Sequence, residues 1–110
     1  MEATCAAGVV GTPCTMAPET MMGAPYTAAA DVYSFGVLLW ELYTGRVPWA
    51  GRRPVQIMYA VVVSGASLDV RDADGVPPAV LALMRACWAA DPLARPSLTE
   101  ILGRLAAVQS

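Results

Sequence analysis

Apolar residues recur at the spacing of an α-helix in several stretches of this chain, and segments rich in glycine and proline separate these stretches. Side chains three or four positions apart share one face of a helix. No convincing sheet pattern and no internal repeat is present. We therefore predict a mainly α-helical chain of about four helices joined by loops, at residues 28–43, 54–64, 78–88 and 98–108.

The first predicted helix, at residues 28–43, is apolar almost all the way round. A helix without a polar face is normally buried on every side. Thr27 is suited to cap its N-terminus, and Gly45 is suited to end it. We expect this helix to be the centre of the domain.

The second predicted helix begins with Pro54 in its first turn and ends at Gly65. The three valines at 61–63 would also suit a short strand, so a strand is the alternative here. If the apolar face of the helix were exposed, it would favour a partner-binding surface. That face consists of Ile57, Met58, Val61 and Val62.

The last predicted helix has the clearest local signature at its start. Ser97 can cap the amide three residues later, and Glu100 can reach back to the amide of Ser97. By contrast, residues 1–27 contain several glycines and prolines without a sustained period, so we expect mostly loop there.

Composition and charge narrow the function classes. The chain has 110 residues, 56% of them hydrophobic and 15% charged, so we expect one folded domain or part of one. Its net charge is -2, and its seven basic residues are scattered arginines, which argues against nucleic acid as a partner. The longest strongly apolar run, residues 35–40, is too short to span a membrane.

The potential metal ligands do not form a recognisable site. Histidine is absent, and the three cysteines form no C-x-x-C pair, so we predict reduced thiols and no zinc site. The acidic residues at 69–75 lack the ligand spacing of a calcium loop, and we interpret them as a solvated loop. We therefore predict no metal site and, from the cysteine usage and the lack of a secretory signal, a cytoplasmic location, although a longer product could be membrane-attached.

Three motifs in order carry a family resemblance. They are residues 11–19 (GTPCTMAPE), residues 31–36 (DVYSFG) and residues 87–96, in which Cys-Trp is followed by Asp-Pro and Arg-Pro. Together they resemble the second half of a eukaryotic protein kinase domain, of the tyrosine-kinase-like group of Ser/Thr kinases. The resemblance implies the helical C-terminal subdomain of the kinase fold, with the N-terminal lobe absent. It divides one partial kinase domain, 1–110, into the end of the activation segment at 1–27 and the helical remainder at 28–110.

The resemblance also implies roles for particular residues. Gly11, Thr12 and Pro13 would shape the substrate groove, and Thr12 favours Ser/Thr over Tyr specificity. Asp31 would anchor the catalytic loop, although an acid in the first turn of a helix also interacts well with the helix dipole on its own.

Two further expectations concern the activation segment. Glu19 and Arg95 would form a buried ion pair that ties this segment to the loop before the last helix. Thr4 is a possible phosphorylation site, because added negative charge can order such a loop against arginines.

The motifs that would supply catalysis are missing from these residues. The chain has no lysine to bind phosphate, and it has no His-Arg-Asp or Asp-Phe-Gly triplet to supply a base or to hold magnesium. We therefore expect no catalytic residue and no bound cofactor in this chain alone. ATP and Mg are implied only for a full-length family member, which would transfer the ATP γ-phosphoryl group to protein hydroxyls.

Three readings of the function remain open. In the first, the chain is the C-terminal part of a Ser/Thr kinase domain, inactive alone, whose partner is a protein substrate or another kinase. In the second, it is a non-catalytic helical protein-binding module or an inactive kinase remnant. In the third, it folds poorly because the central helix lacks the loop that would cover it.

Overall fold

The structure is a computed structural model that describes residues 13–109 of the chain. It is helical, with no strand among those residues. The α-helices are α1 (Pro18–Met21), α2 (Ala28–Thr44), α3 (Pro54–Met58), α4 (Pro78–Cys87) and α5 (Leu98–Gln109). Shorter turns are η1 (Pro13–Thr15), the π-helical η2 (Tyr59–Val63), η3 (Asp72–Asp74) and η4 (Pro92–Ala94).

The four predicted helices correspond to α2, to α3 with η2, to α4 and to α5. Both ends of α2 are as predicted. The Thr27 hydroxyl accepts a hydrogen bond from the amide of Ala30 at the N-terminus. Gly45 ends the helix in the left-handed region, with φ of 69°. At the start of α5 the Ser97 hydroxyl accepts from the amide of Glu100 at 3.1 Å. Residues 61–63 lie in the π-helical turn, so the alternative of a strand is wrong.

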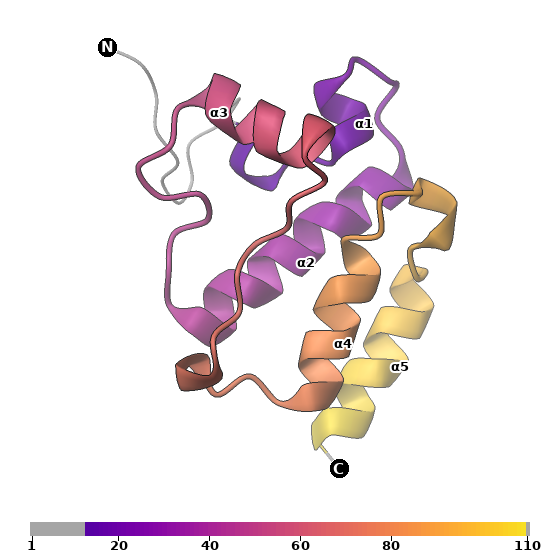
Figure 1. Ribbon diagram of the computed structural model, residues 1–110. Coiled ribbons are helices and arrows are strands. Elements are labelled where there is room, and N and C mark those ends of the chain that lie inside the picture. Colours follow the sequence, from indigo (N-terminus) through magenta and orange to yellow (C-terminus); the bar gives the residue numbers. More distant parts are fainter. Residues whose placement is uncertain (1–12, 110) are drawn as a thin grey trace.

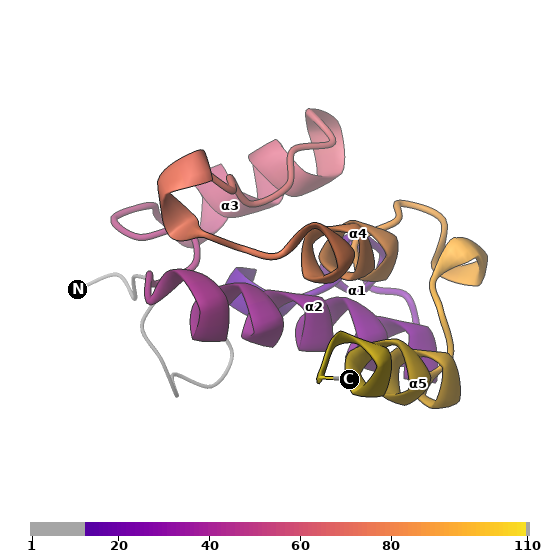
Figure 2. The same ribbon diagram turned by 90° about the horizontal axis from the view of Figure 1, so that it is seen from below.

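The helices are arranged around α2. In Figures 1 and 2, α4 runs alongside α2 and α5 lies beside α4, while α3 lies on the other side of the molecule from α5. α3 and η2 pack on η1 and α1 rather than on α5. The end of the segment 1–27 and the second predicted helix therefore form a small subassembly of their own.

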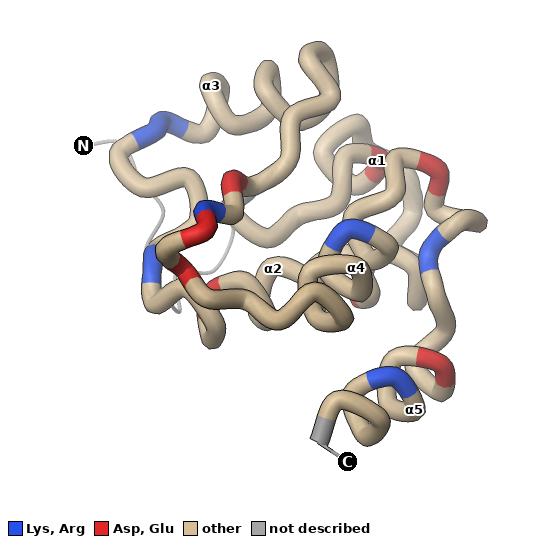
Figure 3. Tube along the Cα trace, turned by 60° about the horizontal axis from the view of Figure 1, so that its bottom comes forward, with Lys and Arg blue, Asp and Glu red and all other residues tan. Residues whose placement is uncertain are grey.

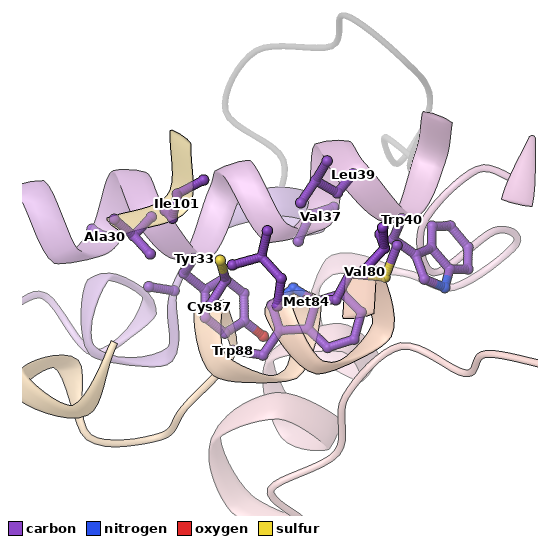
Figure 4. Close-up of a cluster of buried hydrophobic side chains, with 13 residues drawn as sticks. Ala30, Tyr33, Val37, Leu39, Trp40, Val80, Met84, Cys87, Trp88 and Ile101 are labelled. Carbon is purple, nitrogen blue, oxygen red and sulfur yellow. The ribbon is translucent and has the colours of Figure 1, made fainter. Parts of the chain in front are cut away.

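The main core lies between α2, α4 and α5, and Figure 4 shows its side chains. α2 and α4 approach each other closely at Gly36, where an added Cβ would lie 2.7 Å from the Cβ of Cys87. Glycine is therefore required at this position for the two helices to pack. The largest buried contributors include Val37, Trp40, Leu83, Met84, Trp88 and Ile101.

A second, smaller cluster joins α3 and η2 to η1. Ile57 and Val61 are buried there against Cys14. An exposed face here would have favoured a partner-binding surface, but η1 covers Ile57 and Val61, and of the four predicted face residues Met58 is 39% exposed. More strongly exposed apolar side chains of this region lie away from η1, at Val55, Tyr59 and Val63.

Two other expectations also need correction. α2 is not buried on every side, since Leu38 is 47% and Leu42 is 71% exposed. Cys14 takes part in a disulfide, so the prediction of reduced thiols is wrong for this residue, whereas Cys87 is free and buried. Within residues 13–109, none of the helices combines the length and the apolar character that a membrane span requires.

Candidate functional site

The candidate site is built around Arg95, which lies between η4 and α5. The Asp91 carboxylate caps η4 by accepting a hydrogen bond from the amide of Leu93 at 2.9 Å, which fixes the turn that leads into Arg95. The Arg95 side chain is fully buried. A buried guanidinium needs hydrogen-bond acceptors for its N–H groups, and it needs a compensating negative charge.

Glu19, in the first turn of α1, supplies the charge. Arg95 Nη1 lies 2.7 Å from Glu19 Oε2, and Nη2 lies 2.8 Å from Oε1, so the pair is bidentate. This fork geometry is the strongest form of an arginine–carboxylate contact. The structure thus brings together two residues that are 76 positions apart in the sequence.

The remaining Arg95 donors bind backbone carbonyls of two other elements. Nε donates to the Ala89 carbonyl at 2.9 Å, just after α4, and Nη1 donates to the Ala29 carbonyl at 3.0 Å, in the first turn of α2. The guanidinium carbon also lies 5.2 Å from the centroid of the Tyr33 ring, a cation–π contact. One side chain therefore connects α1, α2 and α4 with the segment before α5.

The electrostatics follow from this geometry. The hydrogen bonds from Arg95 hold the pKa of the Glu19 carboxyl below its usual value, although partial burial opposes the shift. Burial raises the pKa of the Tyr33 hydroxyl to about 12, because ionisation there would place a second negative charge in the interior. Glu19 is thus held ionised opposite Arg95 at neutral pH.

Asp31 lies in the first turn of α2 and is exposed. Its carboxylate accepts a hydrogen bond from the Tyr26 hydroxyl, and this bond raises the pKa of Tyr26. Its predicted role as an anchor for a catalytic loop stays a prediction, since such a loop is not among these residues.

The predicted substrate-groove residues lie at the edge of the described region. Gly11 and Thr12 lie outside the described residues, as does the possible phosphorylation site Thr4, and Pro13 begins η1. η1 is held by a contact that the sequence does not predict: Ser34 on α2 donates from its hydroxyl to the Thr15 carbonyl at 2.7 Å. No local pattern around Ser34 or Thr15 would have revealed this contact.

A second polar cluster was missed as well. Arg46, just after α2, pairs with Asp74 at 2.6 Å and with Asp69 at 3.5 Å, and Asp69 also pairs with Arg71 at 3.0 Å. The side chain of Asp74 is only 10% exposed. Most of residues 69–75 are exposed, as expected for a solvated loop, but two of their carboxylates also fix this segment to the end of α2.

The residues described here do not fit ATP and magnesium. Residues 13–109 contain no group of three acidic, cysteine or histidine side chains that could hold a metal ion, and the chain has no lysine to bind phosphate. The site is instead structural, because Arg95 and Glu19 pair with each other and the remaining Arg95 donors bind backbone carbonyls.

Comparison with known proteins identifies the family. The family model for protein tyrosine and serine/threonine kinases matches residues 5–105. A probable serine/threonine-protein kinase of Dictyostelium discoideum is 45% identical over 96 residues, which is 87% of this chain but 10% of that protein. A probable serine/threonine-protein kinase of Arabidopsis thaliana is 41% identical over 90% of this chain and 9% of its own length.

The same extent of similarity is found in an animal kinase. Human mitogen-activated protein kinase kinase kinase 11 is 40% identical over 100 residues, or 91% of this chain and 12% of that protein. The chain thus spans only about a tenth of the length of these curated relatives. The chain belongs to the protein tyrosine and serine/threonine kinase family, and it covers part of a kinase domain.

Proposed function

We propose that this chain is the substrate-side part of a Ser/Thr kinase domain whose complete form transfers the ATP γ-phosphoryl group to hydroxyls of protein substrates. The observation that carries the proposal is the bidentate contact of Glu19 with Arg95. It fixes the end of the 11–19 motif to the helices that follow. A rigid backing of this kind suits a loop that has to hold a protein substrate in one position.

Within this proposal, residues 1–27 form the end of the activation segment and residues 28–110 form the helical remainder. In the complete domain Gly11, Thr12 and Pro13 line the substrate groove, and the hydrogen bond from Ser34 to the Thr15 carbonyl holds η1 against α2. Asp31 is exposed in the first turn of α2, where it is accessible to a catalytic loop. Phosphorylation of Thr4 would act on the same segment, and a cytoplasmic location remains part of the proposal.

The test begins with the transcript on the 5′ side of the Met1 codon. If it encodes a glycine-rich loop, a lysine-bearing strand, His-Arg-Asp and Asp-Phe-Gly, the longer product is expressed and assayed with ATP, magnesium and protein substrates. We expect transfer to Ser and Thr, and no transfer by the 110-residue chain alone. Transfer only to tyrosine, or an inactive longer product, would overturn the proposal.

A second candidate function is a non-catalytic protein-binding module. The observation that favours it is the exposure of Val55 (68%), Tyr59 (62%) and Val63 (66%) along α3 and η2. This alternative would be favoured if the transcript encoded no ATP-binding and catalytic motifs on the 5′ side of the Met1 codon. Substitution of Tyr59 by Ser would then weaken partner capture in cells, whereas the same substitution at Tyr43, on α2, would not.

A further inference from the structure

A cavity of about 550 Å³ lies beyond the C-terminal end of α2, well away from Arg95. It is a half-open pocket lined by the end of α2, the loop from 45 to 53 and the segment from 66 to 71. We name it the Trp49 cavity. Its size is typical of ligand-binding cavities in proteins, and its chemically distinctive lining residues are Trp40, Arg46, Trp49, Arg52, Asp69 and Arg71.

The walls of the Trp49 cavity carry an excess of positive charge. Three arginines line it, against the single carboxylate of Asp69. Asp74, which pairs with Arg46 from outside the lining, does not remove this excess. Figure 3 shows acidic and basic segments of the two loops close together near one end of α2. This local charge contrasts with the net charge of -2 for the whole chain.

Arg46 is held in place before any ligand arrives, and Arg52 lies over an aromatic ring. Arg46 lies 4.9 Å from the centroid of the Trp40 ring, and both Arg46 Nη2 and Trp40 Nε1 donate to the Asp69 carbonyl at 2.9 Å. Arg52 lies 5.2 Å from the centroid of the Trp49 ring. Fixed donors lose little conformational entropy on binding, which favours affinity.

Three features of the cavity favour a ligand-binding role. The Nε atom of Arg46 is buried and has no hydrogen-bond partner among the described residues, which is costly for a charged group. The Arg52 side chain makes no ion pair with any of residues 13–109, although it lies over the Trp49 ring. Trp49 itself has φ of 55°, a strained conformation for a bulky residue, and such strain is common at ligand-binding sites.

We propose that the Trp49 cavity binds a peptide segment of a partner protein that carries an anionic side chain, a carboxylate or a phosphoryl group, next to an apolar residue. Arg52 and Arg71 bind the anion, and the apolar residue packs against Val47 and Leu68. A guanidinium fork matches the geometry of either anion. The proposal is independent of catalysis, because none of these residues belongs to the 11–19 motif or to the Glu19–Arg95 pair.

The observations favour a peptide over a nucleic acid. Trp40 is only 2% exposed, so its ring cannot stack a base, and the negative charge of the whole chain would repel a polyanion. The apolar part of the lining also has no role in binding a free inorganic anion. A peptide with one anionic and one apolar side chain matches both parts of the cavity.

The test follows the indole N–H signals of the full 110-residue chain by NMR. The probes are a short alanine–glycine peptide with phosphoserine followed by leucine, the same peptide with glutamate, the same peptide with serine, and inorganic phosphate. We expect the signals of Trp40 and Trp49 to shift with at least one anionic peptide. We expect the Trp88 signal to stay in place, because Trp88 lies in the main core. The two anionic peptides distinguish phosphoryl from carboxylate recognition.

Two matched variants make the test specific. Arg52→Ala should weaken binding by about tenfold, the effect of losing one hydrogen bond to a charged group. Arg85→Ala removes the same charge from the exposed surface of α4 and should leave the affinity unchanged.

Four results would overturn the proposal: no shift with either anionic peptide at about millimolar concentration, equal weakening by Arg52→Ala and Arg85→Ala, equal affinity for inorganic phosphate, or tighter binding of a single-stranded oligonucleotide.

Discussion

Arg95 keeps a positive charge in the interior, because Glu19 and two backbone carbonyls accept its hydrogen bonds. Removing one member of a buried pair leaves the other charge uncompensated, which typically costs about 3–5 kcal/mol. We therefore expect Arg95→Ala to lower the free energy of unfolding by about 3 kcal/mol or more. Urea unfolding followed by tryptophan fluorescence measures this difference.

The matched control for this prediction is Arg104→Ala. Arg104 lies 3.7 Å from Glu100 in an exposed pair on α5, with side chains 37% and 57% exposed. Such pairs contribute about 0.5 kcal/mol or less. Equal destabilisation by the two substitutions would contradict the structural role assigned to Arg95.

The lowered pKa of Glu19 predicts a loss of stability in acid. Its folded-state pKa lies below the unfolded value of about 4.3, so its contribution is present above that value and is lost as the pH falls through the folded-state pKa. Glu19→Gln should therefore be less stable than the original chain at pH 7, and the gap should narrow below about pH 4. Urea unfolding midpoints at pH 7, 5, 4 and 3 measure the gap, and a gap of constant size would refute the prediction.

At the scale of the element, the close approach of α2 to α4 depends on Gly36. A Cβ added there would meet the Cβ of Cys87 at 2.7 Å and the Nε1 of Trp88 at 2.8 Å. Overpacking of this kind costs about 1–3 kcal/mol, so Gly36→Ala should destabilise the chain although alanine favours a helix. Thermal unfolding of the variant measures the effect.

Gly103 provides the control within the same fold. It lies inside α5, and apart from its chain neighbours and the backbone of the helix itself no atom lies within 4 Å of where its Cβ would be. Gly103→Ala should therefore stabilise the chain by about 0.5–1 kcal/mol through helix propensity alone. If both substitutions changed stability in the same direction, close packing at Gly36 would not be the cause.

Features that depend on residues close together in the sequence could be predicted, whereas contacts between distant residues mostly could not. The caps at Thr27 and Ser97 and the end at Gly45 could be predicted, because each acts on amides or on backbone within a few residues. The ion pair between Glu19 and Arg95 spans 76 positions, and only the family motifs predicted it. Arg46 and Asp74 pair across 28 positions without such a motif, so that contact was missed.

The second helix shows another limit of the pattern. The sequence correctly predicted that Ile57 and Val61 share an apolar face, but it did not predict which element packs against that face. In the structure η1 covers it, and Cys14 belongs to the same buried cluster as these two residues. The burial of α2 was overestimated for the same reason. An apolar residue such as Leu42 shows that burial would be favourable, but it does not show that another element packs against it.

At the scale of the whole molecule, the apolar surface left on α2 and α5 determines how this chain behaves in solution. Leu38 and Leu42 are 47% and 71% exposed on α2, and Leu98 and Leu102 are 55% and 66% exposed on α5. Apolar surface of this extent promotes association between copies. We expect the 110-residue chain to self-associate as its concentration rises, which sedimentation velocity at several concentrations measures.

Replacing both Leu38 and Leu42 by Gln should reduce this association without lowering the midpoint of thermal unfolding, because neither side chain is buried and Gln is a good helix former. The control is Leu39→Gln, because Leu39 is only 5% exposed and its replacement would place an amide in the core. That variant should unfold at a lower temperature. A chain that stays monomeric at every concentration, or a double variant that associates as strongly as the original, would show that this surface of α2 does not drive association.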